Sequence, residues 1–347
     1  MRTRRIVFAS VLAAVAAAVP AAPAMAAGGS VTVMTRNIYL GADIIGLATA
    51  SDKADFQKNA SAMFKVVEAT NFPYRAKGLA KEVKTTKPDL IGLQEAAWWR
   101  TGALDSPAQA TTTKYDFVAE LIAALKKQGQ SYSVVVSQDE FDFEGPTETE
   151  DVRLTMRDVI LKRKGSKVKT TGTSKGNYAE MFKTSTPVGP ADVKRGWTAV
   201  DGSIGGKAFR FVNTHLEAYD VPVGIREAQA RELVDAGGPL SNAALPSILV
   251  GDFNSDPAAA GSDGAAYRAF TGAGFADVYG NKRARTFGQD ELLSKKKPFT
   301  DFIDHIMHRG AGWKVSTKRV VGDKPFSSKA PLWASDHAGI VAKLSLK

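Results

Sequence analysis

Apolar runs of strand length recur along the chain and predict a core rich in β-strands. Each run is dominated by β-branched, aromatic or other apolar residues, which is typical of a strand buried in a sheet. The runs are residues 31–38, 89–95, 132–137, 158–163, 209–216, 247–253, 302–307 and 338–344. Between them, residues 76–85, 115–127 and 225–234 carry apolar residues at helical spacing. Strands and helices mixed in this way predict a layered α/β core.

An acidic segment and a basic segment interrupt this pattern. The acidic one, residues 139–153, contains a Gly145-Pro146 break and is predicted to be an exposed loop. The basic one, residues 282–297, has two interpretations that the sequence leaves open. It is either a solvated loop or a segment that faces the substrate.

The N-terminus has the pattern of a secretory signal peptide. A basic start is followed by a short apolar run and by small residues ending at Ala26, and the run is too short to span a membrane. Loss of residues 1–26 would remove three arginines and lower the formal charge from +10 to +7. We expect residues 27–347 to form one secreted, monomeric domain.

The composition excludes several kinds of chemistry. The chain has no cysteine, which rules out disulfides, thiolate metal sites and cysteine nucleophiles. Neither a P-loop motif nor a G-x-S-x-G elbow is present, so we expect no nucleotide cofactor and no serine hydrolase of that type. The positive charge favours polyanionic partners, although only weakly, since many exported proteins are basic.

Polar side chains gather where the predicted strands end. Three of the four histidines lie there, each beside an acid or an amide. These residues are Asn37, Glu95, Asn213, His215, Asp252, Asn254, Asp304, His305, Asp336 and His337. Ligands of α/β folds bind at strand ends, so we expect one convergent site. Carboxylate and amide oxygens suit Mg²⁺, Mn²⁺ or Ca²⁺, and neutral histidines can move protons, which together predict metal-assisted hydrolysis of a phosphate ester.

The order of these motifs resembles the endonuclease/exonuclease/phosphatase superfamily. The resemblance covers roughly residues 31–347 and rests on "TRNIYLGAD", "PDLIGLQEA", "RDVIL", "FVNTHLEA", "GDFNSDP", "DFIDHIM" and "SDHAGIVAKL". It implies a four-layer α/β sandwich, in which two packed mixed β-sheets are flanked by helices and the site lies at one edge.

The resemblance also implies roles for individual residues. Glu95 matches the main metal-binding glutamate, with Asn37 and Asp336 near the metal. Asp252 matches the aspartate that orients the attacking water, and Asn254 its neighbour that holds the phosphate.

The histidines and their partners complete the implied site. His215 matches the histidine that binds a phosphoryl oxygen or assists the leaving group, and Asn213 supports it. Asp158 falls near the position from which the family supports this histidine. His337 matches a general base or phosphate clamp, and Asp304 matches the acid that hydrogen-bonds it.

Four residues keep two interpretations each. Asp43 is a metal ligand or a loop residue, and His305 is read as structural because it would point to the opposite face from Asp304. Trp98 and Trp99 form either a platform for bases or lipid, or packing under a loop.

The expected activity is that of a secreted phosphodiesterase using Mg²⁺, Mn²⁺ or Ca²⁺. Nucleic acid is the leading substrate, because a basic protein suits a polyanion. A sphingomyelinase or phospholipase C-like action on membrane lipid and a phosphatase action on small molecules are alternatives. A noncatalytic binding module is disfavoured, since Glu95, Asp252, His215 and His337 are all present.

Overall fold

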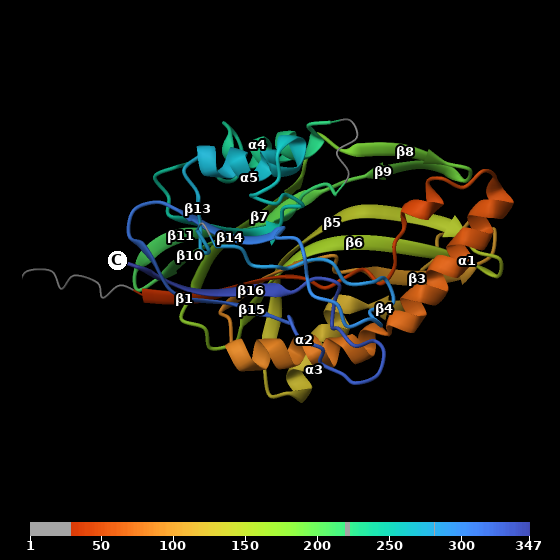
Figure 1. The fold of residues 1–347 in the computed structure, drawn as a ribbon, viewed down its shortest axis with the longest axis horizontal. Helices are drawn as coiled ribbons and strands as arrows, with labels where there is room; N and C mark the ends of the chain where they lie inside the picture. Colours follow the sequence, from red (N-terminus) through yellow and green to blue (C-terminus); the bar gives the residue numbers. More distant parts are fainter. Residues whose placement is uncertain (1–28, 219–222, 281) are drawn as a thin grey trace, which may run out of the picture.

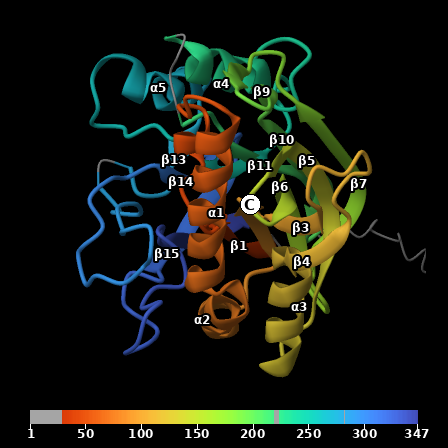
Figure 2. The same ribbon diagram turned by 90° about the vertical axis from the view of Figure 1, so that its right-hand side faces the viewer.

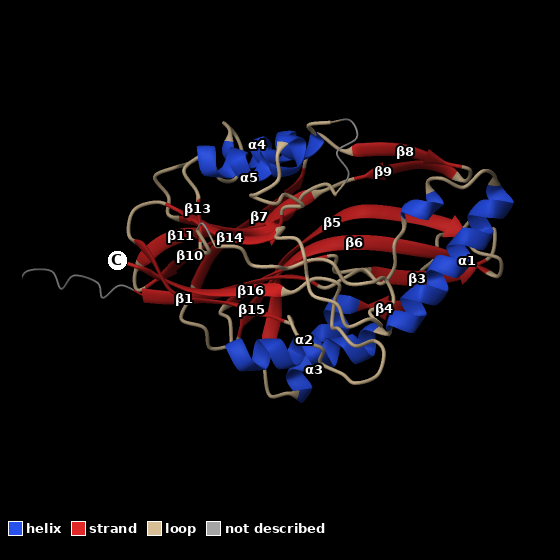
Figure 3. Cartoon of the chain, in the orientation of Figure 1, coloured by secondary structure: helices blue, strands red, loops and turns tan. Residues whose placement is uncertain are grey.

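Two mixed β-sheets packed face to face form the centre of the molecule, with helices outside them (Figures 1 and 3). The computed structural model describes residues 29–218, 223–280 and 282–347. The expected signal peptide, residues 1–26, therefore lies outside the described residues. Within the described part of the chain, no helix is both long enough and apolar enough to cross a membrane.

The first sheet has eight strands in the order β15-β16-β1-β2-β6-β3-β4, with β5 paired to β6. Its pairs are antiparallel except for β1 and β2, which run parallel. The strands are β1 (Gly29–Asn37), β2 (Leu90–Gln94), β3 (Trp98–Ala103), β4 (Thr112–Asp116), β5 (Tyr132–Pro146), β6 (Glu150–Arg163), β15 (Trp313–Val321) and β16 (Gly339–Leu346).

The second sheet has six strands in the order β13-β14-β12-β11-β10-β7, with β11 and β12 parallel. A separate two-stranded hairpin, β8–β9, lies beyond it. The strands are β7 (Lys169–Asn177), β8 (Phe182–Thr186), β9 (Gly189–Val193), β10 (Gly196–Ile204), β11 (Lys207–His215), β12 (Ser247–Asp252), β13 (Ala276–Asp277) and β14 (Asp304–Arg309).

Helices cover both outer faces and one end of this sandwich. In Figure 1, α4 and α5 lie above the second sheet and α2 and α3 below the first, while α1 crosses the end near β8–β9. Figure 2 shows α1 and α2 from that end. The helices are α1 (Lys53–Thr70), α2 (Phe72–Thr86), α3 (Phe117–Lys127), α4 (Ile225–Val234) and α5 (Ala265–Gly272), with short 3-10 turns at Ile45–Leu47 and Gly261–Gly264. The predicted four-layer α/β sandwich is confirmed.

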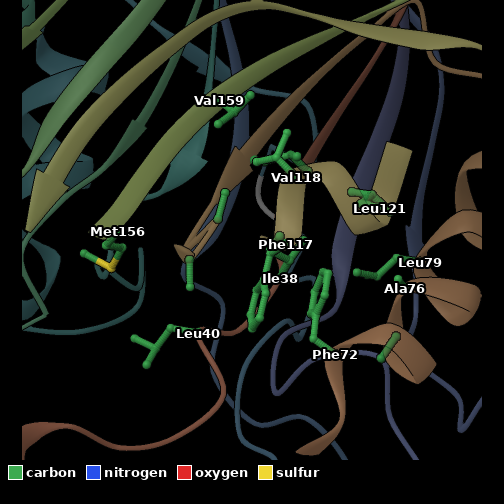
Figure 4. Packing of buried hydrophobic residues seen from close by; sticks show 14 of the residues in the cluster. Ile38, Leu40, Phe72, Ala76, Leu79, Phe117, Val118, Leu121, Met156 and Val159 are labelled. Atoms are coloured by element: carbon green, nitrogen blue, oxygen red, sulfur yellow. The ribbon is translucent and has the colours of Figure 1, made fainter. Parts of the chain in front are cut away.

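Alternation along the strands divides the core into layers. Ile248 and Val250 of β12 lie between the sheets, whereas Leu249 packs toward α4 and α5. On the other outer face, Phe72 of α2 stacks on Phe117 of α3 with ring centroids 3.6 Å apart (Figure 4). Central strands such as β2 and β12 therefore bury side chains on both faces, which explains why their runs are almost continuously apolar.

The two sheets approach each other closely at Gly92 of β2. A Cβ atom there would lie 2.5 Å from Oδ1 of Asn213 and 2.7 Å from a methyl group of Val250. Glycine is needed at this position because any side chain would push the sheets apart.

The prediction of an exposed loop over residues 139–153 is wrong. These residues form the second half of β5, the turn that follows it and the beginning of β6. The two strands pair as one long antiparallel hairpin, and these residues make up the end of it that contains the turn, the far halves of β5 and β6. Phe141 and Phe143 stack on each other with centroids 5.9 Å apart, and they supply the apolar face that a strand needs. The many acids around them hide this pattern in the sequence.

Candidate active site

The site forms at one edge of the sandwich, where the side chains that point between the two sheets change from apolar to polar. In β1 the inward row Val31 and Val33 continues to Asn37, and in β12 the row Ile248 and Val250 continues to Asp252. The same alternation in β11 and β14 leads to His215 and Asp304. Since Asp252 is in register with both His215 and Asp304, the pairing of β11, β12 and β14 brings these three groups together.

Asn37 orients two carboxylates. Its Nδ2 donates to Oε1 of Glu95 at 2.8 Å and to Oδ2 of Asp252 at 3.0 Å. Its Oδ1 accepts from the backbone N–H of Tyr39 at 2.9 Å. Asn37, predicted as a residue near the metal, is thus placed to position Glu95 and Asp252 rather than to offer its own oxygen.

Glu95 stands at a turn directly after β2. Its φ of 54° lies in the left-handed region, which is unusual for a residue other than glycine. Oε2 accepts from the backbone N–H of Leu40 at 2.8 Å. Backbone strain of this kind is common where a side chain must be aimed at a ligand.

Asp252 is buried beside Asn254, which also has a positive φ, of 46°. Burial raises the pKa of Asp252 to about 7, against the opposing effect of His337. Oδ1 of Asp252 accepts from the backbone N–H of Asn254 at 2.9 Å, and the Asn254 amide donates to the carbonyl of Leu216 at 2.9 Å. The turn at residues 252–254 therefore fixes both side chains.

His337 and Asp304 form the hydrogen-bonded pair that the resemblance implies. Nδ1 of His337 lies 2.9 Å from Oδ2 of Asp304, which leaves Nε2 facing Oδ2 of Asp252 at 3.6 Å. Burial alone would lower the pKa of His337, but the carboxylates of Asp304, Asp252 and Asp336 outweigh it and raise the pKa to about 10. This imidazole is therefore a cation at neutral pH.

Asp336 lies on the cavity side of the same loop. Its Oδ1 is 4.0 Å from Nε2 of His337 and accepts from Oγ of Ser335 at 3.3 Å. Burial, followed by the charge of Glu95, raises the pKa of Asp336 to about 6 despite the nearby His337. Asp336 is thus close enough to contribute to a cation site without being in the central cluster.

His215 is held between Arg195 and Asn254. Nδ1 of His215 lies 3.1 Å from a guanidinium nitrogen of Arg195, and Nε2 lies 3.2 Å from Nδ2 of Asn254 and 3.6 Å from Oδ2 of Asp252. Burial, then the charges of Arg195 and His337, lower the pKa of His215 well below its usual value. Because arginine only donates, Nδ1 accepts and the neutral ring carries its proton on Nε2.

Arg195 is itself part of a buried charged group behind the site. It forms an ion pair with Glu217 at 3.3 Å. Glu140 and Asp158 are buried in the same region, and side-chain atoms of Glu140, Asp158 and His215 lie within 4.8 Å of one another. Burial raises the pKa of Glu140 to about 8 and that of Asp158 well above its usual range, while Arg195 opposes both shifts. Asp158 therefore lies behind His215 and does not line the cavity.

Asn213 lies one layer deeper between the sheets. Its Oδ1 accepts from Nε2 of Gln94 at 2.5 Å, and Nδ2 donates to the carbonyl of Leu93 at 3.1 Å. These bonds tie β11 to β2 directly beneath the site. Asn213 thus supports the site through the sheets.

A divalent cation fits the donor groups at the centre of this edge. Ligand atoms of Glu95, Asp252 and His337 all lie within 4.8 Å of one another. Two of these groups are carboxylates, and one is buried with a raised pKa, so a cation between them would relieve the cost of burying its charge. Nε2 of His337 lies in the same group, but in its protonated form it donates a hydrogen bond, so the two carboxylates are the groups that would hold the cation.

A cavity of about 630 Å³ adjoins these side chains. The catalytic candidates Glu95, His215, Asp252, Asn254 and His337 line it at one end. Arg195, Glu217 and Asp336 lie on the same wall. A substrate phosphate could therefore reach every one of these groups from the cavity.

The residues with two interpretations are placed as follows. His305 is fully buried between Oδ2 of Asp277 at 2.8 Å and the carbonyl of Ser255 at 3.1 Å, which is a structural role. Asp43 is exposed and caps the turn at Ile45, so it is a loop residue at the cavity rim.

The two tryptophans differ from each other. Trp99 is buried, donates to the carbonyl of Leu40 at 2.9 Å and forms part of the cavity wall. Trp98 is half-buried, with the guanidinium of Arg100 4.1 Å above its ring. Neither forms an open platform for bases.

Sequence reasoning missed Arg195, Glu217 and Glu140. Glu217 stands two residues after His215, so its place beside the site could have been found. Arg195 reaches His215 only because β10 pairs with β11, with the neighbouring Gly196 opposite His215, and this long-range register is not visible in the sequence.

Comparisons with known proteins agree with this fold. The model of the endonuclease/exonuclease/phosphatase family matches residues 65–337. Among solved structures, a family member from Bacteroides thetaiotaomicron has a TM-score of 0.59 at 20% identity, covering 92% of this chain and 99% of its own. A mannosyl-6-phosphatase from the same species has a TM-score of 0.53 at 20% identity, covering 90% and 99%. The catalytic domain of human nocturnin has a TM-score of 0.51 at 15% identity, covering 92% and 94%. No curated protein matches the chain.

Proposed function

Because this chain belongs to the endonuclease/exonuclease/phosphatase family, we propose that it is a divalent-metal-dependent phosphoester hydrolase. One observation carries the proposal: side-chain atoms of Glu95, Asp252 and His337 converge within 4.8 Å at the end of a cavity, with two carboxylates that could hold a cation and with His337 held by Asp304. Carboxylates and a charged imidazole in this arrangement suit a phosphate group and an attacking water.

The side chains have separate roles in this mechanism. A cation held by Glu95 and Asp252 would supply Lewis-acid stabilisation of the charge on the phosphate. Oδ2 of Asp252, with the amide of Asn254, orients the attacking water. The Nε2–H groups of His215 and His337 donate to phosphoryl oxygens, and the positive charge of His337 stabilises the charge that develops during attack.

The assignment of a proton to Nε2 of His215 has a structural reason. A neutral imidazole can accept at one nitrogen only, and the buried contact with Arg195 takes that role. The other nitrogen faces the cavity side, where Asn254 is an unsuitable partner because its Nδ2 also donates. Among the described residues, the nearest carboxylate oxygen to Nε2 is Oδ2 of Asp252 at 3.6 Å, so a phosphoryl oxygen bound in the cavity would be a closer acceptor.

A nuclease activity is the second candidate, favoured by the positive charge expected for the mature chain. We also propose that the protein is exported, on the sequence pattern of residues 1–26.

The test is hydrolysis by purified residues 27–347 with Mg²⁺, Mn²⁺ or Ca²⁺. Substrates are an aryl phosphate, a bis-aryl phosphodiester, plasmid DNA and RNA. We expect turnover of at least one substrate that EDTA abolishes, and loss of about 100-fold or more in kcat for Asp252→Asn and Glu95→Gln. Turnover that survives EDTA, or a fully active Asp252→Asn variant, would contradict the mechanism.

A further inference from the structure

The cavity beside the site is far more apolar than phosphate chemistry requires. Beyond the catalytic residues, its walls come from α1, from the far halves of β5 and β6, and from the β8–β9 hairpin. In Figure 1 these elements surround the end of the sandwich near α1. Its volume of about 630 Å³ lies within the usual range of small-molecule pockets, roughly 300–1,000 Å³.

Each wall presents apolar side chains to the cavity. Phe56, Ala60 and Met63 line it from α1. Phe141 and Leu154 line it from the β5–β6 hairpin.

The hairpin β8–β9 closes the cavity from the other side. Phe182, Ala191 and Val193 line it from these two strands. A pocket of this size lined mainly by apolar and aromatic side chains is typical of a site for a small molecule with an apolar part.

The apolar walls are continuous with the catalytic end. Arg195 contacts His215 on one side and approaches the sulfur of Met156 at 3.8 Å on the other. Leu40 lines the cavity while its backbone N–H binds Glu95. A molecule with its phosphate at Asp252 would therefore extend directly along apolar side chains.

Charge around the cavity disfavours a polyanion. Among the described lining residues, Arg195 is the only lysine or arginine, and it is paired with Glu217. Asp43 and Glu291 lie at the rim, where the backbone N–H of Asp43 donates to Glu291. Nucleic-acid backbones need rows of unpaired lysine and arginine, which this cavity does not offer.

We propose that the cavity binds the apolar chain of the substrate, so that the preferred substrate is a phosphoester carrying a single long alkyl, acyl or isoprenyl chain. This inference rests on the proposed function, because the catalytic end must anchor the phosphate. The chain would lie between α1, β5–β6 and β8–β9.

The test measures binding, independently of turnover. Wild-type mature protein with Mg²⁺ is titrated by calorimetry with n-alkylphosphonates from ethyl to dodecyl, below their micelle-forming concentrations. We expect affinity to rise roughly threefold to fourfold for each added methylene until the cavity is full. Constant affinity along the series would overturn the proposal.

A matched pair of variants locates the binding. Ala60→Phe fills the cavity from α1, whereas Ala62→Phe makes the same change on the exposed side of that helix. We expect Ala60→Phe to lower the affinity for dodecylphosphonate by about tenfold or more while the affinity for ethylphosphonate is retained. We expect Ala62→Phe to bind both ligands as the wild type does. If Ala60→Phe does not fold, Met63→Glu places a charge at the same wall. Equal binding by the Phe variants would overturn the assignment.

Hydrolysis separates the two proposals. Alkyl phosphates of the same chain lengths are assayed by phosphate release. Metal-dependent turnover without chain-length preference would leave the hydrolase assignment standing and overturn the chain-binding cavity. Chain-length-dependent binding without any metal-dependent turnover would support the chain-binding cavity and overturn the hydrolase assignment.

Discussion

At the scale of single residues, two hydrogen-bonded histidine–aspartate pairs in the described part of the chain have different surroundings. His337 lines the cavity and is held from behind by the buried Asp304, whereas His305 and Asp277 are enclosed in the second sheet. The two residues of the "DH" sequence at 304–305 point to opposite faces of β14, so adjacent positions serve chemistry and packing separately. Direct comparison of these pairs can therefore distinguish a catalytic role from a structural one.

We predict that Asp304→Asn lowers kcat by about 100-fold while the fold is retained, because the amide cannot hold the charged form of His337. The measurement is phosphate release at saturating substrate, with circular dichroism to check folding. Asp277→Asn is the matched control, for which we expect a lower Tm and nearly unchanged kcat. Equal losses of kcat in the two variants would refute the catalytic role of the pair.

A second residue-scale prediction concerns the buried Glu140. Its pKa is raised to about 8 in the folded protein from an ordinary value of 4.5. Between these values the unfolded chain releases the proton first, so ionisation favours unfolding and the free energy of unfolding falls as pH rises from about 4.5 to about 8.

Glu140→Gln removes this dependence. We expect the variant to gain stability relative to wild type between pH 5 and pH 8, by at least about 1.4 kcal/mol, the equivalent of one pKa unit. Urea denaturation at pH 5 and pH 8 measures the free energy of unfolding of both proteins. Glu148→Gln, at an exposed position, serves as control. Parallel pH profiles of wild type and Glu140→Gln would show that Glu140 is not held protonated.

At the scale of elements, the two sheets come into close contact where Gly92 of β2 crosses Asn213 and Val250. We predict that Gly92→Ala destabilises the protein by about 1–3 kcal/mol, because the new Cβ atom overpacks this contact. It should also lower activity, since Glu95 follows three residues later. Gly172→Ala in β7 is the control, because its Cβ atom would meet nothing closer than 3.9 Å. The measurement is thermal unfolding of the two variants. Equal Tm values for Gly92→Ala and Gly172→Ala would contradict the close contact of the sheets at Gly92.

The elements that the sequence predicts are those of the central core. Strands buried on both faces leave continuous apolar runs, so β1, β2, β11, β12, β14 and β16 could be located from the pattern alone. Helix α1, the far half of β5 and the β8–β9 hairpin are not among the predicted elements. These elements turn their apolar side chains toward a cavity and mix them with exposed charges, which weakens the pattern on which the prediction depends.

The site, too, could be predicted from the sequence only in part. Residues at strand ends could be grouped from the sequence because motifs mark them, and the structure brings Asn37, Glu95, Asp252 and His337 together. Arg195 could not be found, because its contact with His215 exists only through the pairing of β10 and β11. The apolar cavity likewise depends on segments far apart in the chain.

At the scale of the whole molecule, the concentration of buried acids around one edge makes stability depend on a bound cation. Side-chain atoms of Glu95, Asp252 and His337 come within 4.8 Å of one another only through the folded sheets, so a divalent ion there would bind the folded state and not the unfolded chain. We predict that Mg²⁺, Mn²⁺ or Ca²⁺ raises Tm, by the equivalent of about 2.7 kcal/mol at a concentration 100 times its Kd.

Differential scanning calorimetry with and without EDTA measures this effect. Glu95→Gln should reduce the metal-dependent shift and should itself unfold at a Tm no lower than that of metal-free wild type, because it removes one charge from the cluster. A metal-dependent increase in Tm that is identical in Glu95→Gln would place the ion elsewhere.

The alternation that carries Ile248 and Val250 into the core also aims Asp252, so catalysis and folding depend on the same strand register. If β12 paired one residue out of step with β11 and β14, Asp252 would turn toward α4 and α5, away from Asn37. A chain misfolded in this way could not be active. The specific activity of refolded protein would therefore measure the fraction of molecules in which β12 has paired in the correct register.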